Sequence, residues 1–282
     1  MDTSNLSPVE VARRDMGKHL FIWAMLAFTL FPFYMMLQIS LKSNVEFNAS
    51  PWLPTAPGQW HWGNYLSGCA LILPSVANTV FVSVTTSVLG LFLALMASYF
   101  FARYKMPFAN VLWGALLVLM LMPSVANIVP LFNLLKSFHL LNTLWALIVV
   151  GTAGAQVVNI FILRNFIEDL PRDLFEAAEI DGATHFQQLL NVVIPMSGPI
   201  LGTLFILLFL NTWNDFLIPL IVLRDPKLFT LGVQLIYLDG EYVKDWGKIM
   251  AAYFVASIPL IVIFLFMMKL FVRGLASGAV KG

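Results

Sequence analysis

Three polar side chains interrupt a long apolar run near residue 213. Asn211, Asn214 and Asp215 are spaced so that a helix would place them on one face. A carboxylate inside an apolar span is costly unless it faces water, a partner chain or a polar solute. Two alternatives follow: the cluster joins this chain to another subunit, or it lines a path for a solute such as a sugar. Aromatic side chains, which stack on sugar rings, flank the cluster: Phe209, Trp213 and Phe216. Weaker amide candidates in other apolar runs are Asn127, Gln156 and Asn159.

A second polar segment, residues 168–195, lies between two apolar runs. Pro171 suits a first helical turn and Gly182 suits the end of a helix. Between them, an acidic row occupies one face and apolar residues occupy another. The acidic row is Asp173, Glu176 and Glu179, and the apolar face is Leu174, Phe175 and Ala178. The pattern predicts a short amphipathic helix.

A second amphipathic helix is expected directly after Gly182. Thr184 followed by Gln187 is a capping-box pattern. An apolar stripe follows at helical spacing, and Pro195 is expected to end it; the stripe is Phe186, Leu189, Leu190 and Val193. Residues 164–195 carry six acids and two arginines, a formal charge of −4. The segment is therefore either a solvated connector or a surface for a basic protein, since an anionic membrane would repel it.

Several kinds of chemistry have no sequence signal in this chain. It has no G-x-x-x-x-G-K-[ST] phosphate loop, no H-E-x-x-H and no G-x-S-x-G. A disulfide within the chain and a cysteine-based zinc site are excluded because Cys69, expected in an outer loop, is the single cysteine. The histidines are scattered, without ligand spacing: His19, His61, His139 and His185. We therefore expect no catalytic residues, no metal and no cofactor bound by this chain.

The composition is that of a membrane protein. Hydrophobic residues make up 60% of the 282 residues, charged residues 11%, and the mean hydropathy is +0.84. Six runs are long enough to span a bilayer as helices. They are Leu20–Ile39, Ser75–Phe101, Val111–Leu131, Leu144–Leu163, Ile200–Val222 and Met250–Phe271. The third, which contains "LMPSVANIVP", is expected to be kinked or partly unwound. The expected fold is an all-α integral membrane protein with six transmembrane helices.

The loop charges set the expected orientation. Ten of the 16 lysines and arginines fall in the two terminal segments, in the loops after the second and fourth runs, and at Lys269 near the end of the last run. By the positive-inside rule these parts are cytoplasmic. We therefore expect cytoplasmic tails at 1–19 and 272–282, a six-helix domain at 20–271, and a cytoplasmic loop at 168–195. The tryptophans of "PWLPTAPGQWHWGNYL" suit the outer interface with membrane lipid. A net charge of +1 gives no reason to expect nucleic acid as a partner.

Four patterns resemble one family in the same order. Glu176-Ala177-Ala178, then Gly182, then Val192-x-Ile194-Pro195 resembles the EAA signature of permease subunits of bacterial ABC importers. Asp181-Gly182-Ala183 with Pro199, "TWNDFLIPL" and the ending "FVRGLASGAVKG" resemble the carbohydrate-importer branch. The similarity covers the chain from about Ser75 to its end and is strongest to the smaller, six-span permease subunit of the maltose class.

The resemblance implies a role for the acidic loop and a set of partners. In that family the short helix is a coupling helix that docks on a separate cytoplasmic ATPase, which binds ATP and Mg. The implied coupling residues are Glu176, Ala177, Ala178, Asp181 and Gly182. The implied partners are a second permease subunit in a heterodimer, two ATPase subunits and an extracytoplasmic substrate-binding protein. The loop before the last run alternates apolar and polar residues near "FTLGVQLIYL" and is expected to contact that binding protein through Tyr237, Asp239 and Tyr242.

Two other classes remain as alternatives. A stand-alone secondary transporter needs ion-coupling residues within its spans and often has an internal repeat. Asp215 is nearly alone as an acid within the apolar runs, and no repeat is evident. An intramembrane enzyme needs a nucleophile with a base, or a metal pair, within the spans, and neither is evident. We therefore expect a non-catalytic permease subunit, in a bacterial inner membrane, that carries a sugar, oligosaccharide or polyol.

Overall fold

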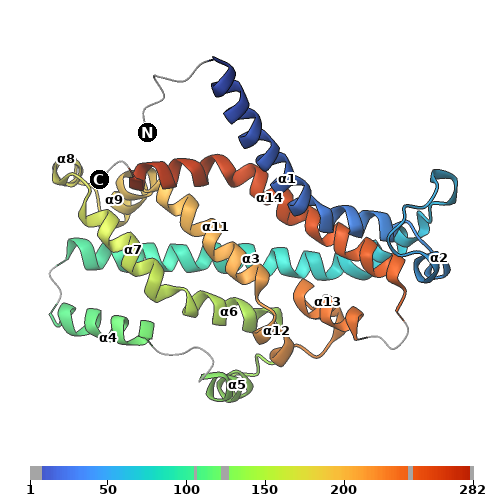
Figure 1. The fold of residues 1–282 in the computed structure, drawn as a ribbon. Helices are drawn as coiled ribbons and strands as arrows, with labels where there is room; N and C mark the ends of the chain where they lie inside the picture. Colours follow the sequence, from blue (N-terminus) through green and yellow to red (C-terminus); the bar gives the residue numbers. More distant parts are fainter. Residues whose placement is uncertain (1–7, 105–106, 122–126, 241–243, 280–282) are drawn as a thin grey trace. The chain divides into compact units, whose positions relative to one another are not determined.

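The computed structural model describes residues 8–104, 107–121, 127–240 and 244–279, and every regular element within them is helical (Figure 1). The elements in chain order are α1 (Pro8–Ser40), α2 (Asn44–Ala49), η1 (Pro57–Gln59), α3 (Gly63–Arg103), α4 (Ala109–Leu121), α5 (Ile128–Ser137), α6 (Leu144–Gly154), α7 (Gln156–Glu168), α8 (Arg172–Ile180), α9 (His185–Gln188), the π-helix η3 (Leu189–Val193), α10 (Ile194–Met196), α11 (Gly198–Asn214), α12 (Leu217–Val222), η4 (Pro226–Leu228), α13 (Leu231–Asp239) and α14 (Trp246–Ala279).

The described helices account for three to five of the expected spans. Three are long and apolar enough to cross a membrane: Met16–Ser40 within α1, all of α3, and Trp246–Leu265 within α14. Two more spans result if each bent helix pair counts as one: α6 with α7, bent by 44°, and the segment His185–Met196 with α11, bent by 81°. The third expected run falls on α4 and α5, which are shorter apolar helices. The expected kink there falls on 122–126, outside the described residues.

The second expected span begins earlier than the apolar run predicts. Helix α3 starts at Gly63, so Cys69 lies inside a helix and the expectation of a loop is wrong. Pro74 also lies inside this helix. With 41 residues, α3 is about 60 Å long, roughly twice the thickness of a bilayer's hydrocarbon core. An apolar run predicts only the part of a helix that lies in lipid. The helix can extend beyond that part, because polar residues also form helical backbone hydrogen bonds.

The chain divides into two compact units, and the first comprises Met1–Leu71 and Leu238–Ile258. Amide side chains connect its distant segments. The Nδ2 atom of Asn64 donates to the carbonyls of Ser40 and Lys42, and Asn44 bonds the backbone of Lys244 and Trp246. The segment before α14 is therefore held against the segment that follows α1.

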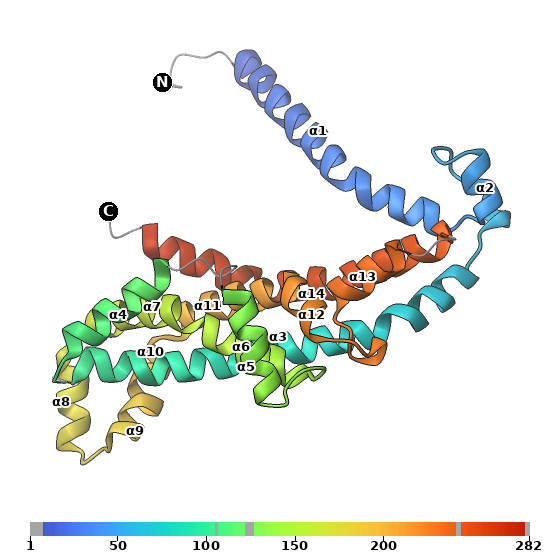
Figure 2. The same ribbon diagram turned by 90° about the horizontal axis from the view of Figure 1, so that it is seen from below.

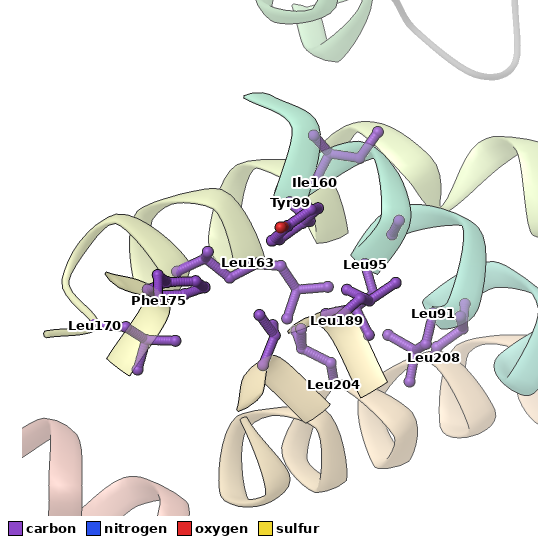
Figure 3. Close-up of a cluster of buried hydrophobic side chains, with 13 residues drawn as sticks. Leu91, Leu95, Tyr99, Ile160, Leu163, Leu170, Phe175, Leu189, Leu204 and Leu208 are labelled. Atoms are coloured by element: carbon purple, nitrogen blue, oxygen red, sulfur yellow. The ribbon is translucent and has the colours of Figure 1, made fainter. Parts of the chain in front are cut away.

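The second unit comprises Ile72–Tyr237 and Pro259–Gly282 and contains two buried clusters. The loop-end cluster joins α3, α7, α8, η3 and α11 (Figure 3). Its 13 buried residues are Leu91, Ala94, Leu95, Tyr99, Ile160, Leu163, Ile167, Leu170, Phe175, Leu189, Val193, Leu204 and Leu208. The other cluster joins α3, α5, α6, α12, Phe229 and α13. Helices α8 and α9 lie together at the Arg103 end of α3 (Figures 1 and 2).

Candidate functional site

The acidic loop forms the two short helices that its sequence predicts. Helix α8 ends at Ile180, and Gly182 follows with φ of +73°. The N–H of Gly182 donates to the Glu179 carbonyl and that of Ala183 to the Ala178 carbonyl, which is a Schellman termination. Glycine suits this position because a side chain is strained at positive φ. The turn therefore fixes the direction in which the chain leaves α8.

One apolar residue anchors α8 to the rest of the unit. Phe175 is fully buried in the loop-end cluster (Figure 3), and the guanidinium carbon of Arg103 lies 3.8 Å from its ring centroid. The expected apolar face was only partly right. Leu174 is 38% exposed although periodicity groups it with Phe175, and Ile180 is 87% exposed. One side chain anchors this two-turn helix, and most of the remainder faces outward.

The exposed side of α8 borders an open groove shared with α9 and η3. Four of the five implied coupling residues line it: Ala177, Ala178, Asp181 and Gly182. The fifth, Glu176, is exposed but does not line the groove. The groove encloses about 460 Å³, and Leu174, Ala183, Gln187, Asn191 and Val192 complete its lining. Small residues on its floor leave room for a side chain of another protein.

The second loop helix begins as expected and ends differently. The Thr184 hydroxyl accepts from the Gln187 N–H, and the Gln187 side chain accepts from the Thr184 N–H, which completes the capping box. Leu189 and Val193 are buried, whereas Phe186 and Leu190 are exposed. The expectation that Pro195 stops the helix is wrong, because Pro195 lies inside α10. The preceding π-helical turn, in which the Ile194 N–H bonds the Leu189 carbonyl five residues back, is wider than an α-turn and accommodates the proline ring.

The Arg103 end of α3 contacts this second helix through a buried polar pair that the sequence analysis missed. The Tyr99 hydroxyl donates to Gln188 Oε1 at 2.8 Å and lies 3.4 Å from His185 Nδ1. Tyr99 and Gln188 are 2% exposed, and the rings of Tyr104 and His185 lie edge to face at 4.8 Å. Because 89 positions separate the bonded pair, no local pattern could reveal it.

The polar cluster in the fifth run lies where the helix breaks. Helix α11 ends at Asn214, and Asp215 Oδ1 accepts from the N–H groups of Leu217 and Ile218 at the start of α12. The expectation of one continuous helical face is therefore wrong. A carboxylate that accepts backbone N–H groups satisfies donors that a new helix leaves unpaired, so Asp215 is built into the junction itself.

The break separates the cluster into two settings. Asn211 and Asp215 line a cavity of about 50 Å³, which we call the junction cavity; its lining also includes Thr79, Val82, Gly151 and Thr230. Asn214 lines a separate open groove of about 250 Å³ with Trp213, Phe216 and residues of α13. The Asn214 Nδ2 donates to the Leu210 carbonyl. The junction cavity has room for a few waters and not for a sugar ring.

Buried hydroxyls gather around and near the junction cavity. Among the described residues, five buried hydroxyl groups in this unit have no hydrogen-bond partner within the protein: Ser83, Thr86, Thr152, Ser197 and Thr230. Ser83, Thr86 and Thr152 lie on helices that line the cavity, Thr230 lines it, and Ser197 lies just before α11. Of the weaker amide candidates, Gln156 bonds the Gly90 and Thr152 carbonyls, Asn159 is buried on α7, and Asn127 is exposed just before α5. Gln156 therefore holds the α6–α7 bend against α3.

The residues expected to contact a binding protein fall in three settings. Tyr237 is 60% exposed on α13 and packs against the Phe229 ring. Asp239 Oδ1 accepts from Lys244 Nζ at 2.6 Å. Tyr242 lies outside the described residues. Most of the segment "FTLGVQLIYL", in which apolar and polar residues alternate, is helical and forms part of α13 (Leu231–Asp239).

Comparison with known proteins identifies the family. Residues 86–277 match the family described as the binding-protein-dependent transport system inner membrane component. This match covers more than half of the chain and includes both the acidic loop and the α11–α12 junction. The chain belongs to this family.

Relatives match this inner membrane component over nearly its whole length. It is 34% identical to a probable ABC transporter permease of Pyrococcus horikoshii, over 95% of this chain and 99% of that protein. It is 33% identical to the arabinooligosaccharides transport system permease protein AraQ of Bacillus subtilis, over 90% of this chain and 91% of that one. A stand-alone secondary transporter is not supported.

A solved structure shows the same fold. With 20% sequence identity and a TM-score of 0.81, the match covers 95% of this chain and 99% of a chain from a bacterial ABC transporter involved in the import of the acidic polysaccharide alginate. The all-helical permease fold is therefore shared, and the family places the chain among transport subunits in the bacterial inner membrane.

Proposed function

We propose that this chain is one of two permease subunits of an ATP-driven importer for a sugar, oligosaccharide or polyol. Two ATPase subunits, which bind ATP and Mg, dock on its cytoplasmic side and on the second permease. An extracytoplasmic substrate-binding protein delivers the solute. Support for a carbohydrate comes from relatives, because AraQ is named for arabinooligosaccharides and the structural neighbour imports alginate.

The observation that carries the coupling role is the two-sided build of α8. Phe175 fixes one side in the loop-end cluster, while the other presents Ala177, Ala178 and Asp181 at the groove with Glu176 beside them. A buried ring holds one side of this helix, and small residues line the other. A partner that binds the small-residue side can therefore displace the helix without unfolding it. The carboxylates suit basic residues of a partner.

Coupling is tested by charge reversal in the complete complex. Glu176→Lys together with Asp181→Lys should release the ATPase subunits and abolish uptake. Both side chains are exposed, so their replacement should leave the fold of the loop intact. Glu168→Lys, also in this loop but paired internally with Arg164, serves as the position control. Normal ATPase copurification and normal uptake in the double variant would make the loop a connector only.

The proposed topology has six spans and cytoplasmic tails. The tails are residues 1–19 and 272–282, the membrane domain is 20–271, and the coupling loop is 168–195. Reporter fusions after Ser43, Leu140 and Leu238 should report the outside, and fusions after Arg103 and Asp181 the inside. An outside report at Asp181 would contradict the coupling role directly.

The polar residues at the α11–α12 junction are proposed to line the solute path. Asn211, Asn214 and Asp215 provide amide and carboxylate groups, and Phe216 is 48% exposed beside Asn214. Uptake of labelled maltose, trehalose, raffinose and glycerol by a deletion strain carrying this chain identifies the substrate. Asn211→Ala and Asn214→Ala should then lower uptake more than assembly. The opposite order would favour the alternative that the cluster joins the two permeases.

Contact with a binding protein is proposed for Tyr237, Asp239 and Tyr242. Photo-crosslinkers at Tyr237 and Asp239 should capture the binding protein in membranes, since both side chains are exposed. A photo-crosslinker at Phe138, 65% exposed on another connection, gives the background level. No capture above that background, with uptake intact after removal of 239–242, would refute this contact.

A further inference from the structure

We propose that α3 transmits ATPase-driven motion of the coupling loop to the junction cavity through a clamp formed by Tyr99 and Arg103. This inference rests on the proposed coupling function and adds two positioning residues and a route to it. Tyr99 and Arg103 lie on adjacent turns at the end of α3, and each contacts a different helix of the loop.

The first contact holds α8. The guanidinium carbon of Arg103 lies over the Phe175 ring, 3.8 Å from its centroid. A cation over an aromatic face is attracted by the ring quadrupole, and burial of the ring strengthens the attraction. Phe175 is fully buried, with Tyr99, Leu163 and Leu170 in the same cluster (Figure 3). A displacement of α8 therefore displaces the end of α3.

The second contact holds α9 on the other side of the Gly182 turn. The Tyr99 hydroxyl donates to Gln188 Oε1 at 2.8 Å where both side chains are buried. The Gln188 Nε2 contacts the Ala183 carbonyl, so the same side chain reaches the turn. Because the two helices are joined by a tight turn and both contact α3, the proposal is that they move with α3 as one body.

The covalent connections of the loop are less direct. Before the loop, the chain bends by 44° between α6 and α7, and after it the chain bends by 81° between Met196 and Gly198. Bends of this kind can absorb displacement by rotating about a few backbone angles. The first bend is also tied to α3, because Gln156 bonds the Gly90 carbonyl. Helix α3, which Figure 1 shows as one unbroken helix, instead connects Tyr99 with Thr79 and Val82. Thr79 and Val82 line the junction cavity. These 20 residues of helix span about 30 Å.

The test separates ATP hydrolysis from movement at the cavity. In a Cys69→Ser background, Val82→Cys places a single thiol on α3 at the junction cavity. Maleimide labelling of this thiol in the assembled complex is compared with and without ATP, and the ATPase rate is measured in parallel. The test variant combines Tyr99→Phe with Arg103→Gln, which removes the hydroxyl and the cation but leaves Phe175 in the cluster.

We expect the double variant to retain ATPase copurification and ATP hydrolysis while the ATP-dependent change in labelling falls about tenfold, as the loss of one buried hydrogen bond and one cation–π contact suggests. Arg164→Gln is the matched control, because Arg164 also stacks on an aromatic ring, that of Trp113 at 4.2 Å, but contacts no part of α8 or α9 in that interaction. It should keep the full response.

Three outcomes decide the inference. A full ATP-dependent labelling change in the double variant overturns the clamp and leaves the coupling loop in place. Loss of the response in Arg164→Gln to the same degree overturns it as well, because the effect would then be general. Failure of the ATPase to copurify even with the unmodified chain would instead contradict the proposed function. If the double variant does not assemble, the same labelling experiment is done with Tyr99→Phe alone, which removes a single oxygen atom.

Discussion

The two ends of α3 within the second unit are built in opposite ways. At the Arg103 end, the polar groups are paired and the apolar groups are packed: Tyr99 bonds Gln188, Arg103 covers Phe175, and the loop-end cluster surrounds them. At the Thr79 end, Asp215 interrupts a helix and the hydroxyl of Thr230 has no partner among the described residues. Paired groups favour one arrangement, whereas unpaired polar groups can exchange partners at little cost. The loop end is therefore suited to move as a rigid body, and the cavity end is suited to change its hydrogen-bond partners.

Among the variants that test the difference between these two ends, Gly182→Pro should have the largest effect on uptake. Proline fixes φ near −65° and cannot adopt the +73° that this turn requires, and it also removes the N–H that bonds the Glu179 carbonyl. The two loop helices then lose their relative direction, so uptake should fall by roughly tenfold or more while membrane insertion is retained. Uptake and ATPase copurification are the measurements.

Gly182→Asn is the control for that variant, because asparagine tolerates the left-handed region far better than most residues. It should retain most of the uptake. Equal loss in both variants would mean that the small size of glycine, and not its backbone conformation, is what matters at this turn.

Phe175→Ala tests whether the loop end is held by packing. Removing a fully buried phenylalanine costs about 3–5 kcal/mol, and the thermal midpoint of the complex in detergent should fall by roughly 5–15 °C. Ile180→Ala changes an 87% exposed side chain on the same helix and should leave the midpoint unchanged. Similar shifts for the two variants would remove the distinction between anchored and exposed sides of α8.

Thr79 and Thr230 provide a matched pair at the cavity end. The Thr79 hydroxyl donates to the Ser75 carbonyl and accepts from the Leu231 N–H, so Thr79→Val leaves a buried donor unpaired at about 1–3 kcal/mol. The Thr230 hydroxyl has no partner among the described residues, so Thr230→Val should change stability by less than about 0.5 kcal/mol. Chemical denaturation in detergent measures both. If Thr230→Val proves the more destabilising, the hydroxyl has a structural role that the described contacts do not reveal.

The smallest effect is expected at Tyr104, just beyond α3. Burial, and then the nearby Glu179 carboxylate, raise the pKa of the Tyr104 hydroxyl above its ordinary value of 10.0. Because the folded state holds this proton more tightly, the stabilisation is complete below pH 10 and is lost as the pH rises through the raised pKa. A small loss of thermal stability above pH 10 should therefore shrink in Tyr104→Phe. An unchanged profile in that variant would assign the alkaline loss to other groups.

Local patterns predicted the parts of this structure that depend on neighbouring residues. The Thr184–Gln187 capping box and the Gly182 turn follow from a few adjacent side chains and form as expected. The helix break at Asp215 did not follow, because the spacing of Asn211, Asn214 and Asp215 is also that of an unbroken helix. Hydropathy could not distinguish the two, since both place apolar residues in the membrane.

Contacts between distant segments were the main omission. Periodicity puts Leu174 and Phe175 on one face, yet only Phe175 meets the partners that α3 and α7 supply. The Tyr99–Gln188 bond is likewise decided by packing of two segments far apart in the chain. Four of the five residues that the family signature singles out lie together at one exposed groove, and their coupling role stays a prediction. The residues that hold this helix in place carry no signature of their own.

The π-helical turn at Leu189–Val193 also sets an angular phase. It contains one residue more than the α-turn it replaces, and each residue of an α-helix advances the chain by about 100° around the axis. The short helix α10, which follows the turn, is therefore rotated by about that amount relative to a regular continuation of α9. Leu189 and Val193 face the cluster while Ser197, where the chain turns into α11, is also buried. The inserted residue thus acts as an indexing step, which sets the side of α10 that faces the cluster before the chain bends into α11.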